Sequence, residues 1–223
     1  MIKPKLGQHF LKNQGVLEKI VKSADLKPND RVLEIGPGKG ILTKKIEGRV
    51  RELVKVEKDP ELAKLTNALN QDILEFPLPP KDFKIIGNIP YYITGKILKK
   101  FAGFFCVYLV QREVAKRILA RDGKESILSI SIKQWGTPEI VGKVSKNSFS
   151  PPPKVDSAIL RIIPLGKSLE IDMKVVKKAF SEKRKQIGNT LPKSIIQESG
   201  ITRTKRPEDL TLKEWITLSK TKD

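Results

Sequence analysis

The stretch "NIPYY", residues 88–92, follows the apolar run "FKIIG" directly. Ordinary turns favour glycine and small polar residues, whereas this one combines an amide with two aromatic rings. Asn88 offers a side-chain carbonyl, the backbone at Ile89 and Pro90 offers a second one, and Tyr91 offers a flat face. Two acceptors can hold one exocyclic amino group, so the set suits a flipped-out adenine. The alternative is a strand that ends at a proline, followed by core tyrosines.

A glycine loop lies upstream, where "EIGPGKG" places Gly36 and Gly38 after an apolar run. Glycine lets a ligand lie directly against the backbone. The dinucleotide fingerprint G-x-G-x-x-G requires a third glycine at position 41, where this chain has Ile41. The spacing therefore favours a ligand without a pyrophosphate, although a plain tight turn would use the same glycines.

Two acids lie at the ends of the next two predicted strands. Glu57 lies about 20 residues past the glycine loop, where a carboxylate can accept hydrogen bonds from both hydroxyls of a ribose. Asp72, in "QDI", could accept one from the amino group of an adenine. These positions fall at the carboxyl ends of strands, where open α/β sheets bind ligands. Together they predict a pocket for S-adenosylmethionine rather than NAD, unless Glu57 is only a surface acid.

The predicted elements place these residues in a doubly wound α/β sheet. The segment 126–135 alternates like a strand, but its context also allows a helix, so its type stays open. Residues 148–154 contain three prolines in a row and predict a stiff connector. Beyond residue 166 the spacing is helical, which predicts domains at 1–166 and 167–223. Predicted strands are 31–35, 51–59, 68–73, 83–88, 104–111, 138–144 and 156–163; predicted helices are 13–25, 41–48, 60–65, 94–102, 112–120, 175–191 and 210–220.

The composition narrows the chemistry. The 223-residue chain carries 44 Lys and Arg against 25 acids, a net charge of +19, which favours a nucleic-acid partner over a merely solvated surface. Its one cysteine, Cys106, lies in an apolar run, so disulfides and thiolate metal sites are not expected. With His9 as the only imidazole, catalysis by histidine is disfavoured, and no metal site is expected. No apolar run is long enough for a membrane helix, and no secretory signal is evident.

A series of motifs occurs in order along nearly the whole chain: "LGQHFL", "VLEIGPGKGILT", "VEKD", "QDI", "NIPYYIT", "QREVAKRI", "FSPPPKVDSA" and "FSEKRKQIGNTL". The chain resembles the ribosomal RNA adenine N6,N6-dimethyltransferases of the KsgA type. The resemblance implies a Rossmann-like class I S-adenosylmethionine-dependent methyltransferase domain with a small C-terminal helical domain. It also implies a role in ribosome biogenesis, acting on ribosomal RNA in a small-subunit precursor. We expect a cytoplasmic location, because "GQHFL" begins too close to Met1 for an organelle presequence. We also expect a monomer, because nothing in the sequence suggests a larger assembly.

The resemblance also assigns roles to residues. The methionine end of the cofactor would lie against Gln8, His9 and Leu11. The cofactor backbone would lie against Gly36 and Gly38, its ribose on Glu57 and its adenine on Asp72. Asn88 and Pro90 would hold the target amine, with Asn88 also touching the cofactor. Tyr91 and Phe149 would sandwich the target adenine, unless Phe149 is a loop aromatic that covers the core. Phosphates would bind Lys183, Arg184 and Lys185, which could otherwise be a solvated helix face.

The chain departs from the family in length. The segments 57–72 and 92–111 and the C-terminal domain are shorter than the family pattern, which puts the position of Asp72 and the RNA-docking surface in question. One rival is a non-catalytic RNA-binding assembly factor, and the intact pocket motifs argue against it. Another is the same chemistry on large-subunit RNA or DNA, since the erythromycin-resistance methyltransferases share the architecture. A dehydrogenase is disfavoured by Ile41.

Overall fold

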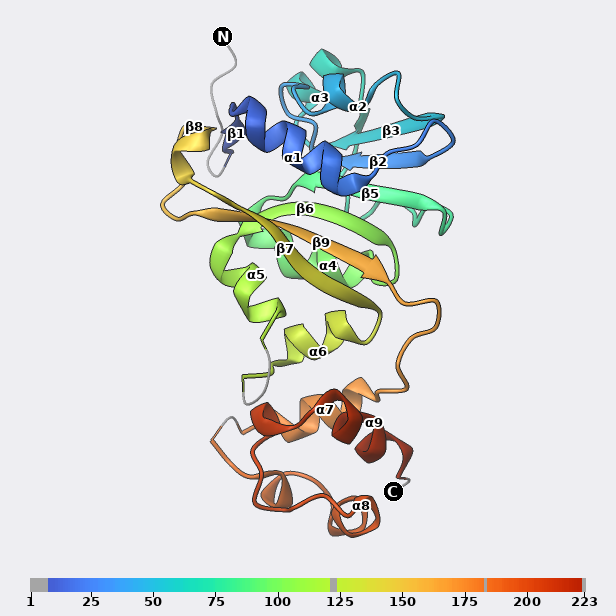
Figure 1. The fold of residues 1–223 in the computed structure, drawn as a ribbon, viewed down its shortest axis with the longest axis vertical. Coiled ribbons are helices and arrows are strands. Elements are labelled where there is room, and N and C mark those ends of the chain that lie inside the picture. The colour runs from blue at the N-terminus through green and yellow to red at the C-terminus, as the bar shows by residue number, and fades with distance from the viewer. Residues whose placement is uncertain (1–7, 121–123, 183, 222–223) are drawn as a thin grey trace.

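The computed structural model of the chain describes residues 8–120, 124–182 and 184–221. A seven-stranded sheet with the order β4-β3-β2-β5-β6-β9-β7 forms its centre (Figure 1). The five strands from β4 to β6 are parallel, and β9 runs antiparallel to both β6 and β7. The predicted α/β class is confirmed. The strands are β2 (Arg31–Ile35), β3 (Glu52–Glu57), β4 (Leu69–Asn70), β5 (Phe83–Asn88), β6 (Phe105–Gln111), β7 (Gly136–Val144) and β9 (Ser157–Pro164).

Helices cover both faces of the sheet, as a parallel sheet requires. On one face, Val32 of β2 and Ile86 of β5 pack with the first two helices in one apolar cluster. On the other face, Leu33 and Ile85 pack with the fourth, fifth and sixth helices. Neighbouring residues of a strand point to opposite faces, so each strand contributes to both layers. The helices are α1 (Gln14–Ala24), α2 (Thr43–Ile46), α3 (Pro60–Thr66), α4 (Thr94–Lys100), α5 (Arg112–Ile118) and α6 (Ile127–Lys133).

The segment left open between strand and helix is the helix α6. Its first turn is capped by Ser126, whose hydroxyl accepts from the Ser129 backbone N–H. Ile132 packs in the sheet cluster, while Ile130 packs in the cluster of the C-terminal helices. The strand-like alternation arises because the helix is buried between two different partners, so apolar residues lie on both of its sides.

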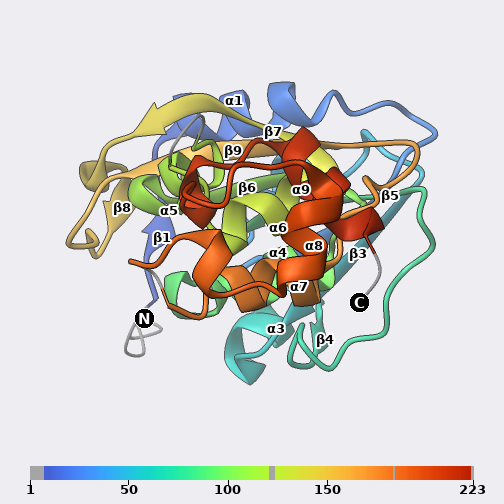
Figure 2. The same cartoon turned by 90° about the horizontal axis from the view of Figure 1, so that it is seen from below.

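The C-terminal helices α7 (Met173–Ala179), α8 (Lys193–Ser199) and α9 (Leu212–Lys220) lie below α6 (Figures 1 and 2). They surround the buried Trp215 in an apolar cluster of their own. The predicted helix at 175–191 is wrong in its second half, because residues 181–186 have no apolar side chain to bury. The boundary proposed at residue 166 falls between β9 and α7, and the division into two domains stays a prediction.

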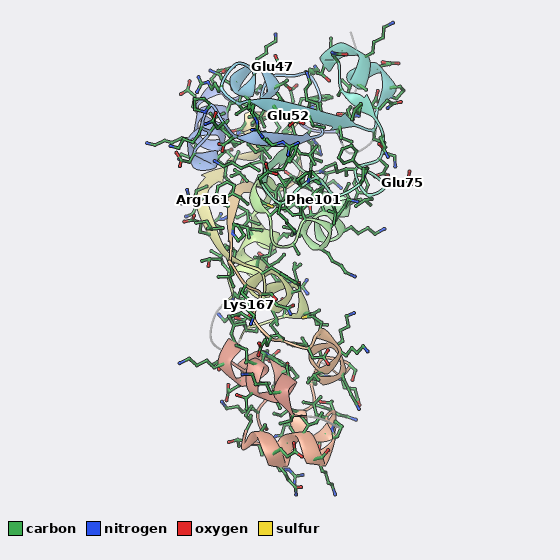
Figure 3. The ribbon with its side chains drawn as sticks, turned by 90° about the vertical axis from the view of Figure 1, so that its right-hand side faces the viewer. Glu47, Glu52, Glu75, Phe101, Arg161 and Lys167 are labelled. Carbon is green, nitrogen blue, oxygen red and sulfur yellow. The ribbon has the colours of Figure 1, made fainter. Side chains whose placement is uncertain are left out.

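Ion pairs are concentrated at the edge where β2, β3 and β5 begin. Figure 3 views this side and labels Glu47 and Glu52. Glu52 pairs with Arg31 at 2.6 Å, and Glu47 pairs with Lys55 at 3.0 Å. Lys27 is paired with Asp25, and Lys84 with Asp30. Much of the positive charge at this edge is therefore locally compensated.

Cys106 is buried, as predicted, and its thiol donates to the Phe104 carbonyl oxygen at 3.4 Å. Burial raises the pKa of this thiol to about 12. Within the described ranges, 8–120, 124–182 and 184–221, we find no helix with the length and apolar character that a membrane span demands.

Gly87 sets the spacing of the two central strands just before Asn88. A Cβ at this position would lie 2.6 Å from the Ile35 carbonyl oxygen, which belongs to the backbone and cannot rotate away. We expect Gly87→Ala to lower the free energy of unfolding by about 1–3 kcal/mol, because the strands must separate. Urea denaturation measures this.

The matched control is Gly95→Ala. Gly95 is exposed in α4, and a Cβ there would meet no atom within 4 Å. This substitution should stabilise the protein by about 0.5–1 kcal/mol, as alanine does in helices. Equal effects of the two substitutions would contradict the assigned role of Gly87.

Candidate active site

A cavity of about 420 Å³ opens at the carboxyl ends of β2, β3 and β5. Residues from sequence positions 8 to 92 meet there because parallel strands end at the same edge of the sheet. The structure brings most of the predicted site residues to this one cavity: its lining includes Gln8, His9, Leu11, Gly36, Gly38, Glu57, Asn88, Pro90 and Tyr91.

The glycine loop curls around one end of the cavity. Gly36 has φ +65° and Gly38 has φ +59°, a left-handed conformation that side chains disfavour. A Cβ on Gly38 would also lie 3.3 Å from the ring of Phe10. The loop thus needs glycine for its conformation and for the close approach of the N-terminal segment.

Glu57 fixes this loop to the start of α3. One carboxylate oxygen accepts the Gly38 backbone N–H at 3.1 Å, and the other accepts the Asp59 N–H at 3.0 Å. The residue is buried. A carboxylate oxygen accepts more than one hydrogen bond, so both oxygens keep capacity for a diol in the cavity. The alternative of a free surface acid is therefore wrong.

A two-stranded sheet, missed in the sequence, holds the N-terminal segment over the cavity. It pairs β1 (Phe10–Leu11) with β8 (Phe149–Ser150) in antiparallel fashion. The His9 ring Nδ1 lies 2.9 Å from the Pro151 carbonyl oxygen, 142 residues away in sequence. Strands of two residues have no periodicity to detect, so the sequence offers no signal for this pairing.

Asn88 is held with its amide in one orientation. Its Nδ2 donates to the His9 carbonyl oxygen at 2.9 Å. Its Oδ1 accepts no hydrogen bond from any described residue, and neither does the Ile89 carbonyl. The Pro90 carbonyl is already used by the Ile93 N–H at 3.2 Å. The two acceptors available beside the cavity are therefore Asn88 Oδ1 and the Ile89 oxygen.

Tyr91 stands beside this amide and is also fixed. Its hydroxyl lies 2.6 Å from Ser157 Oγ, and its ring stacks at a distance on that of His9. Burial raises the pKa of the Tyr91 hydroxyl, so it stays protonated at neutral pH. The ring is placed to offer a face rather than to exchange protons.

The sequence reading missed Glu34, a buried carboxyl that lines the cavity. One oxygen accepts the Thr43 hydroxyl at 2.8 Å, and among the described residues no partner is found for the other. Burial raises the pKa of Glu34 to about 7. An acid inside the otherwise apolar strand "RVLEI" was the available signal, because strand interiors of this kind rarely hold an unpaired charge.

Two predicted residues lie elsewhere. The Phe149 side chain is 1% exposed, packs in the α1-side cluster and does not line the cavity, so it covers the core and cannot stack on a base in this conformation. Asp72 is also not among the lining residues. Because β4 ends at Asn70, Asp72 falls in a turn, where it caps the Leu74 N–H and pairs with Lys58 at 2.8 Å. Lys58 and the Leu74 N–H lower its pKa.

The predicted phosphate-binding run is described in part. Lys183 lies outside the described residues. Arg184 is exposed, and Lys185 pairs with Glu182 at 2.6 Å. The run is not helical in the described residues, so the alternative of a helix face is wrong. Among residues 8–120, 124–182 and 184–221, no group of His, Cys, Asp and Glu side chains has the arrangement of a metal site.

Comparison with known proteins gives one consistent family. The sequence model of "Ribosomal RNA adenine dimethylase" matches residues 1–223. The chain is 35% identical to "Ribosomal RNA small subunit methyltransferase A" of Dehalococcoides mccartyi strain BAV1, with 94% of this chain and 84% of the relative covered. It is 36% identical to the protein of the same name from Prochlorococcus marinus strain NATL1A, with coverage of 97% and 89%.

Two solved structures are similar in fold over almost the whole chain. A dimethyladenosine transferase from Plasmodium falciparum superimposes with a TM-score of 0.83 at 26% identity, covering 94% of this chain and 96% of the other. The 23S rRNA methyltransferase ErmE superimposes with a TM-score of 0.78 at 27% identity, covering 94% and 98%. The alignment to the D. mccartyi protein is 249 positions long although this chain has 223 residues, so the relative carries insertions that this chain lacks.

The raised pKa of Glu34 makes stability depend on pH. Because the folded pKa, about 7, exceeds the usual 4.5, the folded state holds the proton more tightly, and this stabilisation is lost as pH rises from about 4.5 to 7. Relative to Glu34→Gln, the wild-type free energy of unfolding should fall by up to about 3 kcal/mol across that window. Urea denaturation from pH 4 to 8 measures it; parallel curves for the two proteins would contradict the assignment.

Proposed function

Because the chain belongs to the ribosomal RNA adenine dimethylase family, we propose that it dimethylates adenine N6 in small-subunit ribosomal RNA with S-adenosylmethionine. The enzyme class and the cofactor follow from the family. The proposal for this site rests on the orientation of Asn88. Its Nδ2 donates a hydrogen bond to the His9 carbonyl oxygen, and its Oδ1 is left as an acceptor beside the cavity.

The cavity has the features that S-adenosylmethionine requires. Its volume, about 420 Å³, lies within the range of roughly 300–1,000 Å³ that small-molecule sites occupy. The ribose would bind Glu57, and the glycine loop would lie against the adenosine. Glu34 adds a buried carboxyl facing the cavity, which favours a cationic ligand. Asp72 would reach the cofactor adenine only after leaving Lys58.

When bound, the cofactor supplies an electrophilic methyl group on sulfur and leaves as S-adenosylhomocysteine. The protein then has to position a weak nucleophile, because the adenine N6 lone pair is delocalised into the ring. Asn88 Oδ1 and the Ile89 carbonyl oxygen would each accept a hydrogen bond from the N6 amino group. These two hydrogen bonds would favour a pyramidal nitrogen. Methyl transfer would form the N–C bond as the C–S bond breaks, and the resulting cation would then lose one N6 proton to solvent. Catalysis is thus mostly positioning and electrostatics.

Two alternative functions differ in how much support they have. A non-catalytic RNA-binding factor would not need the anchored Glu57 or the oriented Asn88 amide. A large-subunit substrate is favoured by the similarity to ErmE, whose name states 23S rRNA. The small-subunit methyltransferases A reach higher sequence identity, at 33–36% over at least 94% of this chain, and this favours the small subunit.

We further propose that the RNA approaches from the cavity side and the C-terminal helices. The opposite edge carries compensated pairs such as Arg31–Glu52 and Lys27–Asp25. In the C-terminal part, the exposed Arg184 would bind a phosphate. Lys183 would do the same, and Lys185 would exchange its partner Glu182 for a phosphate. A small-subunit precursor as substrate, a monomeric state and a cytoplasmic location complete the proposal.

Methyl transfer from labelled S-adenosylmethionine to unmethylated small ribosomal subunits tests this function. Nucleoside analysis should yield N6,N6-dimethyladenosine. Transfer only to large-subunit RNA would support the ErmE-like rival, and binding of subunits without transfer would support the assembly-factor rival.

Replacement of Asn88 tests the site. Asn88→Ala should lower the transfer rate at least about 100-fold while RNA binding persists, since it removes both the Oδ1 acceptor for the reacting amine and the Nδ2 bond to the His9 carbonyl. Asn147→Ala is the matched control, because Asn147 is exposed and outside the cavity lining. Unchanged turnover of Asn88→Ala would reject the role of Asn88.

Replacement of two basic residues tests the RNA surface. Arg184→Ala combined with Lys185→Ala should weaken subunit binding and make its salt dependence shallower. The log–log slope should change by about 0.7–0.9 for each phosphate that the variant no longer neutralises. Lys27→Ala serves as the control, because Lys27 lies at the opposite edge and pairs with Asp25 at 2.7 Å. Equal weakening for the two proteins would contradict the proposed orientation.

A further inference from the structure

Helix α6 is shared between the sheet and the C-terminal helices, which lie next to it (Figure 1). Ile132 packs in the cluster of the sheet, whereas Ile130 is buried in the cluster that surrounds Trp215. A helix that is buried on two sides cannot move away from either partner without exposing apolar surface to water. The apolar contacts of α6 therefore hold the two parts of the molecule together.

The connector between β9 and α7, residues 165–172, is bonded to the end of α6. The Leu165 N–H donates to the Trp135 carbonyl oxygen at 2.8 Å. The Leu169 N–H donates to the Gln134 carbonyl oxygen, also at 2.8 Å. A connector without such contacts would let the C-terminal helices move relative to the sheet. These two bonds remove much of that freedom.

The side chain of Gln134 adds two more bonds to the connector. Its Nε2 donates to the Ile171 carbonyl oxygen at 2.7 Å and to the Leu169 carbonyl oxygen at 3.3 Å. A carbonyl oxygen only accepts, and an amide nitrogen carries two N–H groups, so this orientation of the amide satisfies both partners. Gln134 thus holds the connector through its backbone and its side chain together.

The other end of α6 is attached to the C-terminal part as well. The Glu125 N–H donates to the carbonyl oxygen of Glu208, which lies in the turn before α9. The Glu125 side chain is buried and forms an ion pair with Lys133 of α6. Because attachments at both ends of a helix prevent the rotation that one attachment allows, the C-terminal helices keep one orientation relative to α6.

This attachment determines where the basic residues of the C-terminal part lie. Arg184 and Lys185 follow the end of α7 at Ala179 by only a few residues. When two contacts to one ligand are held at a fixed separation, binding at the first raises the effective concentration for the second, provided that the ligand spans the same distance. The gain is lost when the separation varies.

We propose that Gln134 is a positioning residue for the RNA substrate: by holding the connector against α6, it fixes the distance between the cavity and Arg184 and Lys185. This rests on the proposed function, in which RNA contacts both places. The protein would then favour an RNA in which the distance from the target adenine to a backbone phosphate matches this separation.

Distances between two spin labels test the fixed separation without turnover. Glu61→Cys on α3 and Glu198→Cys on α8 give exposed labelling sites on the two sides of α6, and the natural Cys106 is buried. Double electron–electron resonance should give one narrow distance distribution. Adding Gln134→Met, which keeps the side-chain length but has no N–H group, should make the distribution at least about twofold wider.

Steady-state kinetics of the unlabelled variant test the consequence for the substrate. Gln134→Met should raise KM for small subunits about 5- to 20-fold, because the second contact loses effective concentration. Gln134 does not line the cavity, so kcat and the dissociation constant of S-adenosylmethionine should stay close to the wild-type values. Gln14→Met is the matched control, because Gln14 is exposed on α1, and it should change neither the kinetics nor the distances.

Three outcomes would overturn the proposal. A broad distribution in the labelled parent would mean that the C-terminal helices are not fixed. Equal widths with and without Gln134→Met would remove the role of Gln134. A loss of kcat together with weaker binding of S-adenosylmethionine would mean that Gln134 acts on the stability of the whole protein. If wild-type protein makes no N6,N6-dimethyladenosine, the proposed function fails instead, and the label distances still decide whether Gln134 fixes the C-terminal helices.

Discussion

The hydrogen bond from Asn88 Nδ2 to the His9 carbonyl oxygen is the contact on which the site depends. It joins the end of a central strand to a segment outside the seven-stranded sheet. It leaves Asn88 Oδ1 beside the cavity without a hydrogen-bond partner among the described residues. One interaction thus orients the Asn88 amide and ties it to the N-terminal segment.

The rest of the fold holds the two segments that this hydrogen bond joins. On the strand side, Gly87 lets β5 approach β2 closely, so Asn88 leaves the sheet beside the glycine loop. On the other side, pairing of Phe10 and Leu11 with β8 holds the N-terminal segment in reach. Glu57 then fixes the glycine loop with both carboxylate oxygens. The cavity is preorganised by hydrogen bonds between buried or half-buried side chains and the backbone, which suits a reaction that needs positioning.

Much of this could be predicted from sequence for a physical reason. The strands at 31–35 and 83–88 are continuous buried runs bounded by glycine or proline, so pattern alone gave their limits. Their carboxyl ends, together with that of β3, place Gly36, Glu57 and Asn88 at one edge. The direction of a side chain within a two-residue strand such as β8 has no such signal, and Phe149, which the resemblance places in the site, packs in the core. The same holds for Asp72, whose position depends on where a two-residue strand ends.

Long-range contacts were also beyond sequence patterns. The bond between His9 and Pro151 spans 142 residues, and nothing local announces it. Helix α6 alternates like a strand because the sheet and the C-terminal helices bury different sides of it. The sequence shows Glu34 as an acid between apolar residues of a strand. Only the structure shows that it accepts a hydrogen bond from Thr43 and lines the cavity.

A crystal structure of the protein with S-adenosylhomocysteine and an adenine nucleotide would test the central claim most directly. The account predicts the base beside Asn88, with N6 within hydrogen-bond distance of Oδ1 and with Nδ2 still on the His9 carbonyl. A rotated Asn88 amide, or a base bound away from Asn88 while the cofactor site is filled, would contradict it.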